Sequence, residues 1–445
     1  MRRFEFVQAG FVACVRVMPI SVTGALFGGM RLKRLKDPVI KGYRERGMLQ
    51  KVVTHEEIIK RAHALGKLAE SKLTEADANG GYDKEFRDAL HETGIHRILR
   101  PKRYGGLGLS HRTMLEAVRT VSQYSVAGGW LTLFMPAHEC WVAMLPPKGR
   151  EEIFGSDEFV ADILYPIGKV EYVEGGVRLS GRWQWGSGIE MCGWIGLGAM
   201  VDLPGELFGI EGGPQACLCT IKVSEGHIIR DWKAFGLNGS GSHSIEVKDV
   251  FVPWHRVCPL AAIKKNAVPI GGEFDPEEAV YHTPFGPAFA IGFATIALGG
   301  AQRLQRELRE RLRNRQRIVL GMKEWESPVA QRNLGEVTTM VETAEALYER
   351  ALQQIESWTS QDRTSASEEE QARVAAWRCN VGRIAAQVGF RTMELLGGAA
   401  AYRGDLVEVF ARDLFMMSIH FGQAYDDHMM FYGRSQYGLS AHPLV

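Results

Sequence analysis

The hydrophobic pattern changes its period twice along this 445-residue chain, and this limits the possible folds more than any other feature. Apolar residues recur at helical spacing from Thr54 to about residue 158, alternate with a period of two from about 159 to 257, and return to helical spacing after Pro287. Helical spacing buries one stripe of a helix, whereas a period of two buries one face of a strand. We therefore predict an α+β protein, with a helical domain at 48–158, a β-domain at 159–286 and a helical bundle at 287–445.

The N-terminal helical domain is predicted from start signals and apolar spacing. Thr54-His-Glu-Glu57 has the form of a capping box, in which the threonine side chain accepts a hydrogen bond from the first turn of the helix. Breaks that are rich in glycine or contain proline separate the predicted helices, which cover Thr54 to Leu73, Lys84 to Thr93, Arg112 to Ser122 and Trp130 to Leu145.

The middle segment has the pattern of short antiparallel strands. A Gly175-Gly176 pair is typical of a hairpin turn, and the residues that alternate after it are Val177, Leu179, Gly181, Trp183 and Trp185. Further apolar strands are predicted at 194–201, 216–221 and 245–252.

Two apolar stripes predict the long helices of the C-terminal bundle. The first stripe consists of Leu334, Val337, Met340, Val341, Ala344, Leu347, Tyr348, Ala351 and Ile355. The second consists of Trp377, Val381, Ile384, Ala385, Val388 and Leu395, and it ends at Gly397-Gly398, a pair expected to stop the helix. Because only the short polar segment 360–370 joins the two, we predict an antiparallel bundle.

Charge is unevenly distributed along the chain. Residues 1–47 contain 10 Lys and Arg against 3 Asp and Glu, although the whole chain has a formal net charge of only +1. The remainder is therefore mildly acidic, which gives no electrostatic reason to expect a nucleic-acid partner.

Arg16 interrupts the apolar run near the start, and no stretch reaches 18 uncharged apolar residues, so neither a signal peptide nor a membrane-spanning helix is predicted. We interpret residues 1–47 as a poorly ordered or non-native extension, with Met48 as an alternative start, and a targeting segment is the other interpretation.

The cysteines and short motifs exclude several classes of site. The seven cysteines show neither zinc-ligand spacing nor the density of a disulfide framework, which indicates a cytoplasmic protein without a metal site. There is no dinucleotide-binding glycine motif, P-loop or nucleophile elbow. The glycine-rich cluster from Gly236 to His243 could offer amides to a phosphate, but a surface turn between strands is the simpler interpretation.

Two motifs of the predicted β-domain match those of one known family. They are Trp185-Gly186-Ser187-Gly188, with Trp194 nine residues after Trp185, and the segment Asp249 to Pro253. The first resembles the flavin-facing segment of the acyl-CoA dehydrogenase superfamily, and the second resembles the strand end that closes its β-domain. The order of a helical domain, a β-domain and a helical bundle is also that of this family.

The C-terminal bundle carries two more motifs of this kind. Ala301-Gln302-Arg303, with Arg315 twelve residues later, resembles the helix whose arginine reaches a flavin phosphate across a subunit interface. Gly397-Gly398, followed by Arg412-Asp413, resembles the family's glycine pair and Arg-Asp motif. The resemblance covers about residues 55–440 and implies an acyl-CoA dehydrogenase-like fold.

One departure from the family pattern bears on the reaction. The common dehydrogenases carry, after their Arg-Asp motif, a glutamate that removes a proton from the substrate, whereas the matching position here holds Phe421. A phenylalanine cannot take a proton, so this base is missing. The Arg-Asp motif followed by His420 instead resembles the branch of two-component flavin-dependent monooxygenases, as does the strand at 181–188.

That branch implies roles for particular residues. In it, reduced flavin supplied by a separate NAD(P)H:flavin reductase reacts with O2 to a C4a-hydroperoxyflavin, which hydroxylates an aromatic substrate. The resemblance implies that Ser187 bonds to flavin N5, that His420 removes a phenolic proton, and that His138 contacts the substrate. It further implies a homotetramer that binds FMN, with FAD as the other option, through Trp185, Gly186, Ser187, Arg315, Gly397 and Gly398.

Other interpretations of the same residues stay open. Ser187 could be an ordinary turn serine, His420 a buried core histidine, Trp185 and Trp194 plain core, and Arg315 part of a solvated charged helix face. Two other functions are compatible with the sequence: an acyl-CoA dehydrogenase or flavin oxidase with its base elsewhere, and a flavin-free helical scaffold. The sequence does not identify the substrate, nor whether carbon, nitrogen or sulfur is oxygenated.

Overall fold

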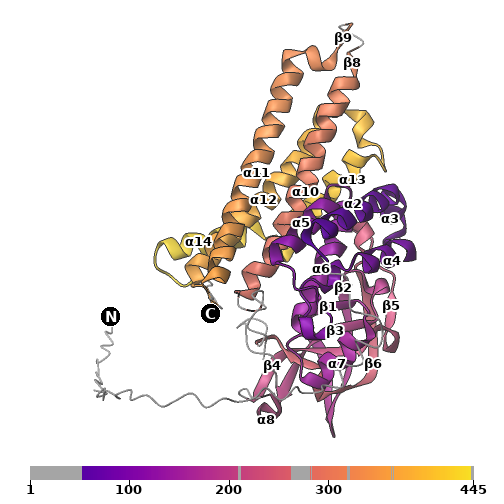
Figure 1. The fold of residues 1–445 in the computed structure, drawn as a ribbon, viewed down its shortest axis with the longest axis vertical. Coiled ribbons are helices and arrows are strands. Elements are labelled where there is room, and N and C mark those ends of the chain that lie inside the picture. The colour runs from indigo at the N-terminus through magenta and orange to yellow at the C-terminus, as the bar shows by residue number, and fades with distance from the viewer. Residues whose placement is uncertain are drawn as a thin grey trace, which may run out of the picture. The chain divides into compact units, whose positions relative to one another are not determined.

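The computed structural model describes residues 53–208, 212–261, 281, 283–317, 321–361, 363 and 365–441. Within these residues, helices α2–α7 come first, strands β1–β7 follow, and the long helices of the bundle come last (Figure 1). The predicted extension at 1–47, with Cys14 and the alternative start Met48, lies outside the described residues. The six described cysteines are all buried free thiols.

Among the described residues of the N-terminal part, six α-helices occur: α2 (His55–Ser71), α3 (Leu73–Asn79), α4 (Lys84–Thr93), α5 (His111–Ser122), α6 (Val126–Val142) and α7 (Pro147–Ser156). As predicted, Thr54 caps α2, because its side chain accepts a hydrogen bond from the backbone N–H of Glu57 at 3.2 Å. Helix α6 begins four residues earlier than predicted, since Ser125 caps it by accepting from the backbone N–H of Gly128 at 3.0 Å. Every residue of α6 is buried, so this helix is the core element around which the other parts pack.

The seven-stranded sheet has the order β5-β6-β2-β1-β3-β4-β7. Its strands are β1 (Val160–Val173), β2 (Gly176–Gly186), β3 (Trp194–Leu203), β4 (Gly213–Lys222), β5 (His227–Ile229), β6 (His243–Pro253) and β7 (Val257–Pro259), with a short helix α8 (Gly205–Phe208) between β3 and β4. The predicted hairpin at Gly175-Gly176 joins β1 to β2. By resemblance, the segment Asp249 to Pro253 was expected to end the last strand of the β-domain, but a further strand, β7, follows it and pairs with β4.

One strand pair differs from the predicted antiparallel sheet, because β1 and β3 run parallel. Strand β1 changes neighbours along its length: residues 160–163 pair with β3, residues 169–173 pair with β2, and the register with β3 shifts between Ile163 and Gly168. The connection at 187–193 carries the chain from β2 to the other side of β1, so β3 runs in the direction of β1. Residue 187 therefore lies in a crossing between two strands rather than in a tight hairpin.

The predicted alternation of β2 fails at one residue. Trp183 is fully buried as expected, but Trp185 is 68% exposed. The pairing of β2 with β6 shifts between Trp183 and Gly186, and Trp185 adopts a positive φ of 74°. Such an irregularity turns a side chain to the other face of the strand, so the interpretation of Trp185 as core is wrong.

The C-terminal part is a bundle of helices with the bounds α10 (Phe285–Asn314), α11 (Pro328–Ser360), α12 (Glu368–Leu396), α13 (Leu406–Ser418) and α14 (Tyr425–Gln436). Successive long helices run in opposite directions, and a small β8–β9 ribbon (Gln316–Arg317 and Met322–Lys323) lies between α10 and α11 (Figure 1). As predicted, α12 ends at Gly397, whose φ of 74° suits a glycine.

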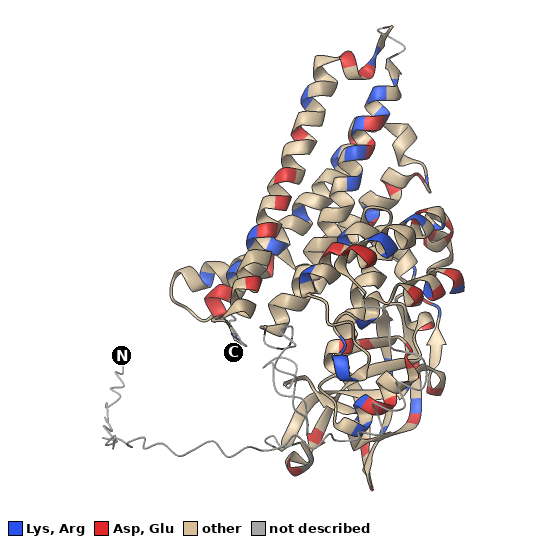
Figure 2. Cartoon of the chain, viewed as in Figure 1, with Lys and Arg blue, Asp and Glu red and all other residues tan. Residues whose placement is uncertain are grey.

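Helix α10 is long and apolar enough to span a membrane by length and composition alone. However, 72% of its apolar window is buried inside the structure, where it packs against α5, α6, α11, α12 and α13. Its apolar character is thus explained by its place in the core. Basic and acidic residues are interspersed over the helices rather than separated into stripes (Figure 2).

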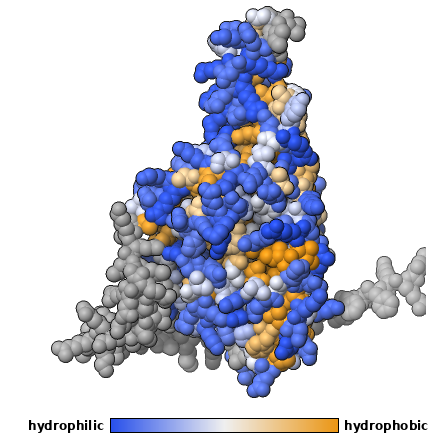
Figure 3. Space-filling model, turned by 90° about the vertical axis from the view of Figure 1, so that its right-hand side faces the viewer, coloured by the Kyte–Doolittle hydropathy of each residue, from blue (hydrophilic) through white to orange (hydrophobic). Residues whose placement is uncertain are grey.

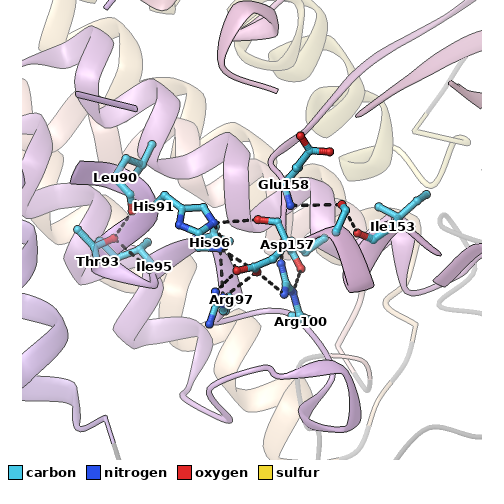
Figure 4. Close-up of polar contacts among 12 residues, drawn as sticks. Leu90, His91, Thr93, Ile95, His96, Arg97, Arg100, Ile153, Asp157 and Glu158 are labelled. Carbon is cyan, nitrogen blue, oxygen red and sulfur yellow. Dashed lines mark hydrogen bonds and ion pairs between the residues drawn. The ribbon is translucent and has the colours of Figure 1, made fainter. Parts of the chain in front are cut away.

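An ion network joins α6 to the segment before β1, and Figure 4 shows the part of it around Asp157. Arg100, which is 4% exposed, donates to both carboxylate oxygens of Glu139 on α6 at 2.6 and 2.7 Å, and to Asp157 at 2.9 Å. Arg97 pairs with the same Asp157, which lies three residues before β1 in a left-handed conformation with φ of 56°. Removing one partner from a buried pair leaves an uncompensated charge, so the network ties these segments firmly together.

The first predicted domain boundary, at 158/159, lies between two described elements, since helix α7 ends at Ser156 and β1 begins at Val160. The second, at 286/287, falls in the first turn of α10. We propose residues 48–158, 159–286 and 287–445 as the three domains.

Candidate active site

Ser187 and His420 come from distant parts of the sequence, and both contact the same tryptophan, Trp130. The indole N–H of Trp130 donates to Ser187 Oγ at 3.0 Å, and the ring of His420 lies edge-on to the same indole at a centroid distance of 5.1 Å. Trp130 is on α6, Ser187 follows β2 and His420 follows α13, so the helical core, the sheet and the bundle each contribute one residue. Trp130 is a site residue that the sequence interpretation missed.

Ser187 belongs to a line of three buried serine hydroxyls. Its Oγ lies 2.9 Å from Ser242 Oγ, which lies 2.7 Å from Ser240 Oγ. These serines are 8%, 5% and 1% exposed, respectively. Ser240 and Ser242 belong to the glycine-rich cluster, so its interpretation as a surface turn is wrong for these two residues.

The Arg412-Asp413 motif holds this serine-bearing loop in place. Arg412 donates to the carbonyl of Phe235 at 2.8 Å, and Asp413 accepts from the backbone N–H of Leu237 at 2.6 Å. A Cβ at Gly236 would stand 2.3 Å from the carbonyl oxygen of Arg412, so only glycine allows this close approach. Burial raises the pKa of Asp413 to about 7, although the bond from Leu237 works in the opposite direction.

His420 begins the short turn Phe421–Gln423 and is held in one orientation by it. Its Nδ1 accepts a hydrogen bond from the backbone N–H of Gly422 at 3.2 Å, which leaves Nε2 as the protonated nitrogen of the neutral ring. Burial, followed by the charge of Arg378, lowers the pKa of His420 to about 4. The imidazole is therefore neutral at pH 7.

Arg378 on α12 stabilises the turn that carries His420. Its guanidinium is bonded to the carbonyl of Gly422, to Gln423 Oε1 at 3.1 Å and to His428 Nε2 at 3.0 Å. Arg378 is only 4% exposed, and within the described ranges no carboxylate forms an ion pair with it. Because the hydrogen-bond partners of Arg378 are neutral, its positive charge is not compensated. This charge disfavours a second positive charge on the nearby His420.

An aromatic wall extends from Trp130 along α6 and α10. Phe134 lies one helical turn after Trp130, with ring centroids 4.8 Å apart, and Phe293 lies 5.6 Å from Trp130 and 5.0 Å from His420. Phe289 continues the wall at 5.6 Å from Phe293. Together these rings form one apolar surface beside Ser187 and His420.

His138 stands at the far end of the same face of α6, two turns after Trp130. Its Nδ1 donates to the carbonyl of Val160 at 2.6 Å, and its Nε2 lies 3.5 Å from a carboxylate oxygen of Asp162 without a hydrogen-bond partner. Burial raises the pKa of Asp162. His138 thus contacts the aromatic wall through Phe134, at 5.2 Å between centroids, but not the serine hydroxyls directly.

The remaining predicted flavin-binding residues gather at a different place, the outer end of α10. Arg315 caps this helix and donates to the carbonyl of Leu396 at 3.0 Å, directly before Gly397 and Gly398. Its side chain is 48% exposed, with Glu324 at 3.7 Å. Arg315 and the glycine pair therefore form a second cluster, separate from Ser187 and His420 within one chain.

Trp194 has a structural role. It is 1% exposed, donates to Ser156 Oγ at 3.0 Å and lies under the guanidinium of Arg256. These contacts join α7 to the sheet, in a secondary core away from Ser187. Of the two tryptophans in the motif, only Trp185 reaches the surface.

Three potential metal ligands lie close together, but their surroundings suit an ion network. His91, His96 and Asp157 place one ligand atom each within 4.8 Å of one another (Figure 4). Burial opposes ionisation of Asp157, but hydrogen bonds from both histidines and the charges of Arg97 and Arg100 outweigh it and hold its pKa far below the ordinary value. The carboxylate is already neutralised by two guanidinium groups, which would repel a cation.

A family model described as "Acyl-CoA dehydrogenase, C-terminal domain" matches residues 291–425. The chain is 27% identical over 372 residues to a pigment production hydroxylase from Rhodococcus sp. (strain ATCC 21145), an alignment that covers 83% of this chain and 93% of the relative. It is 26% identical over 363 residues to the oxygenase component of p-hydroxyphenylacetate 3-hydroxylase from Acinetobacter baumannii, covering 80% of this chain and 83% of the relative.

Solved structures show the same fold. XiaF from Streptomyces sp., in complex with FADH2 and glycerol, matches with a TM-score of 0.78 at 20% identity and covers 92% of this chain and 99% of its own. TdsC from Paenibacillus sp. A11-2, in complex with FMN and indole, matches with a TM-score of 0.70 at 20% identity and covers 86% of this chain and 97% of its own. The predicted order of helical domain, β-domain and bundle is thereby confirmed.

Proposed function

The chain belongs to the acyl-CoA dehydrogenase superfamily, and from this premise we propose that it is the oxygenase component of a two-component flavin-dependent monooxygenase that hydroxylates a phenolic substrate. The observation that carries this proposal is the convergence of Ser187 and His420 on Trp130. A buried hydroxyl group and a neutral imidazole then flank one aromatic surface. Relatives with this architecture include hydroxylases of p-hydroxyphenylacetate and of resorcinol.

The residues beside Ser187 fit a flat heteroaromatic cofactor. Trp185 holds a positive φ that is rare for any residue other than glycine, and it exposes its indole two residues before Ser187. Phe421, next to His420, is 73% exposed. Such strain persists where the surrounding structure enforces it, often at functional sites, and exposed rings next to buried polar groups suit the stacking of an isoalloxazine. We infer FMN, with FAD as the alternative.

When bound, reduced flavin supplies the electrons that activate O2, and the protein positions the reactants and moves the protons. Ser187 would hold a hydrogen bond to the edge of a bound flavin, and Trp130 fixes the Ser187 hydroxyl by donating to it. For His420 to accept the phenolic proton as a general base, its Nδ1 must release the hydrogen bond from Gly422, because Nε2 already carries the proton of the neutral ring. The aromatic wall of Phe134, Phe289 and Phe293 excludes water and holds the substrate ring.

His138 and Asp162 suit the recognition of a polar substituent on the substrate. They present an unpaired imidazole nitrogen and a carboxyl group at the end of an otherwise apolar wall. His138 donates through Nδ1 to the carbonyl of Val160, so its Nε2 faces the Asp162 carboxyl group at 3.5 Å and is left for a substrate group. A substrate hydroxyl can bond to such a pair as donor or as acceptor.

We infer a homotetramer in which the exposed Arg315 cluster meets the flavin of another subunit. A groove of about 940 Å³ between α11, α12 and α13 supports this inference. Its lining includes Gly397, which belongs to the Arg315 cluster, and Ser418, which lies two residues before His420. Phe390 and Phe415 in this groove keep 38% and 36% of their surface exposed. Figure 3 shows apolar side chains gathered at the level of the sheet and a more hydrophilic surface above them.

Reconstitution tests the proposal. The protein, a separate flavin reductase, NADH and a panel of phenols should yield hydroxylated product that carries ¹⁸O from ¹⁸O2, and omission of the reductase should abolish it. In the Ser187→Ala variant, more of the reducing equivalents should appear as hydrogen peroxide. Bleaching of oxidised flavin by an acyl-CoA would instead identify a dehydrogenase, and failure to bind flavin in either redox state would identify a scaffold protein.

A further inference from the structure

The hydroxyl groups of Ser187, Ser242 and Ser240 form a hydrogen-bonded chain in which the contact with Trp130 has one possible donor, whereas the contacts between the serines have two. Its first contact is one-way, because an indole N–H can only donate, so Ser187 accepts from Trp130. In the other two contacts, Ser187 with Ser242 and Ser242 with Ser240, either oxygen can be the donor. Because Ser242 has a single hydrogen, three arrangements are possible, and they differ only in the rotation of the O–H groups. Ser187 donates to Ser242 in two of them and accepts from Ser242 in the third.

The count of donors and acceptors shows what each state offers. A serine hydroxyl donates once and accepts twice. When Ser187 donates to Ser242, one acceptor position of Ser187 is filled by Trp130 and the other is free for an incoming N–H. When Ser240 donates to Ser242 and Ser242 to Ser187, both acceptor positions of Ser187 are filled, and its own hydrogen points to an acceptor outside the chain.

We propose that Ser242 and Ser240 are positioning residues that let Ser187 accept a hydrogen bond from reduced flavin and donate one to oxidised flavin. The proposal rests on the proposed function. Position N5 of the isoalloxazine carries a hydrogen in reduced flavin and a lone pair in oxidised flavin, so its partner must be an acceptor in one case and a donor in the other. A lone buried serine would leave its own hydrogen unpaired opposite the N5–H group, and an unpaired buried donor is costly.

The scaffold around the chain supports this role. The backbone N–H of Gly188, next to Ser187, donates to the carbonyl of Ser240 at 2.8 Å, which fixes the two segments relative to each other. The bond from Leu237 to Asp413 anchors the other end of the loop. Because the backbone is fixed at both ends, a reversal of the chain needs only the O–H groups to rotate.

Separate binding measurements on oxidised and reduced flavin test the proposal. In Ser242→Ala, the Ser187 hydroxyl loses its internal acceptor, which is needed only when the flavin donates. The Kd of reduced FMN, measured by anaerobic calorimetry, should rise about tenfold, and the Kd of oxidised FMN, measured by fluorescence quenching, should change less than about twofold. Ser240→Ala should have a smaller effect in the same direction, because it lies one bond further away. The same titrations with FAD cover the other flavin.

Two controls separate this role from a general structural one. Ser244 is the first control, because it lies two residues after Ser242 and is also buried. Its hydroxyl donates to Asp231 rather than to the serine chain, so Ser244→Ala should leave the ratio of the two Kd values unchanged. In a Ser187→Ala background, Ser242→Ala should have no further effect on that ratio, because its action passes through Ser187. The melting temperature of each variant confirms that it is folded.

Equal losses for both redox states in Ser242→Ala, or an undiminished effect in the Ser187→Ala background, would overturn this inference and leave the proposed function standing. If the unmodified protein binds neither redox state of flavin, the proposed function is wrong, and this inference, which rests on it, is wrong as well.

Discussion

The predicted flavin-binding residues fall into two clusters that differ in how complete they are within one chain. Around Ser187 the polar groups are buried and bonded to one another, and His420 stands against the same indole. The side chain of Arg315 is 48% exposed; it donates to the carbonyl of Leu396 and lies 3.7 Å from the carboxylate of Glu324. The first cluster is built by the fold of a single chain, whereas the second presents a charged group outward.

This difference indicates which properties belong to the chain and which depend on assembly. The Ser187 cluster joins α6, the sheet and the bundle, so it exists as soon as the chain folds. The Arg315 cluster lies at the outer end of α10, and it contributes to a flavin site only if another subunit brings a flavin to it. Substitutions in the first cluster should therefore change chemistry, and those in the second should change affinity and depend on protein concentration.

The largest effect is expected from His420→Ala. Loss of general-base catalysis costs about 10²- to 10⁴-fold, so single-turnover formation of hydroxylated product should fall by that factor while the affinity for reduced flavin changes little. Rapid-quench measurement of product, with flavin binding measured in parallel, checks both parts. An equal loss in flavin affinity would mean that His420 holds the cofactor rather than acting on the substrate.

The second largest effect is expected from Arg315→Ala. A hydrogen bond to a charged group contributes about 1.5–3 kcal/mol, so the Kd of the flavin should rise about 10- to 100-fold while the protein stays folded. The flavin affinity of the unmodified protein should also fall on dilution below the dissociation constant of the oligomer, as followed by light scattering. Arg313→Ala, on the last turn of the same helix, is the matched control. A monomer that retains full flavin affinity would contradict the role of Arg315.

The sequence allowed the fold to be predicted well, because the clues to it are local. The capping box at Thr54, the period of two up to Trp183 and the glycine stop at Gly397 each depend on a few neighbouring residues. The parallel pairing of β1 with β3 was not predictable in this way, since it depends on how residues 187–193 cross the sheet.

Site residues were harder to predict, because their signals are not local. Trp130 looked like one apolar residue in a buried helix, and only its contact with Ser187 reveals its role. Ser240 and Ser242 have the composition of an ordinary turn, and their burial results from the contact of Phe235 and Leu237 with Arg412-Asp413. The pair of Ser187 and His420 could be suggested only by resemblance, since 232 intervening residues separate them in the sequence.

A smaller effect, on pH dependence, is expected at Arg378. Burial is the larger cause of the low pKa of His420, and the charge of Arg378 adds to it. In Arg378→Met the pKa of His420 should move from about 4 towards 6.5, whereas Arg378→Lys should retain most of the lowering because it keeps the charge. NMR titration of the His420 ring proton, assigned by its loss in His420→Ala, measures the shift. The same pKa in all three proteins would show that burial alone is responsible.

The smallest effect is expected from Asp413→Asn and concerns the pH dependence of stability. Burial raises the pKa of Asp413 from 3.8 to about 7, so the folded protein binds a proton here that the unfolded chain has released above pH 4. This group therefore favours folding fully below about pH 4, and the contribution is lost as the pH rises through 7. Asparagine does not titrate, but it can still accept the bond from Leu237. The free energy of unfolding of the original protein minus that of Asp413→Asn should decrease steadily from pH 4.5 to pH 7.5 in urea titrations. A difference that stays constant over this range would mean that Asp413 titrates outside it, and that the loop bearing Ser240 and Ser242 is anchored by a charged carboxylate throughout.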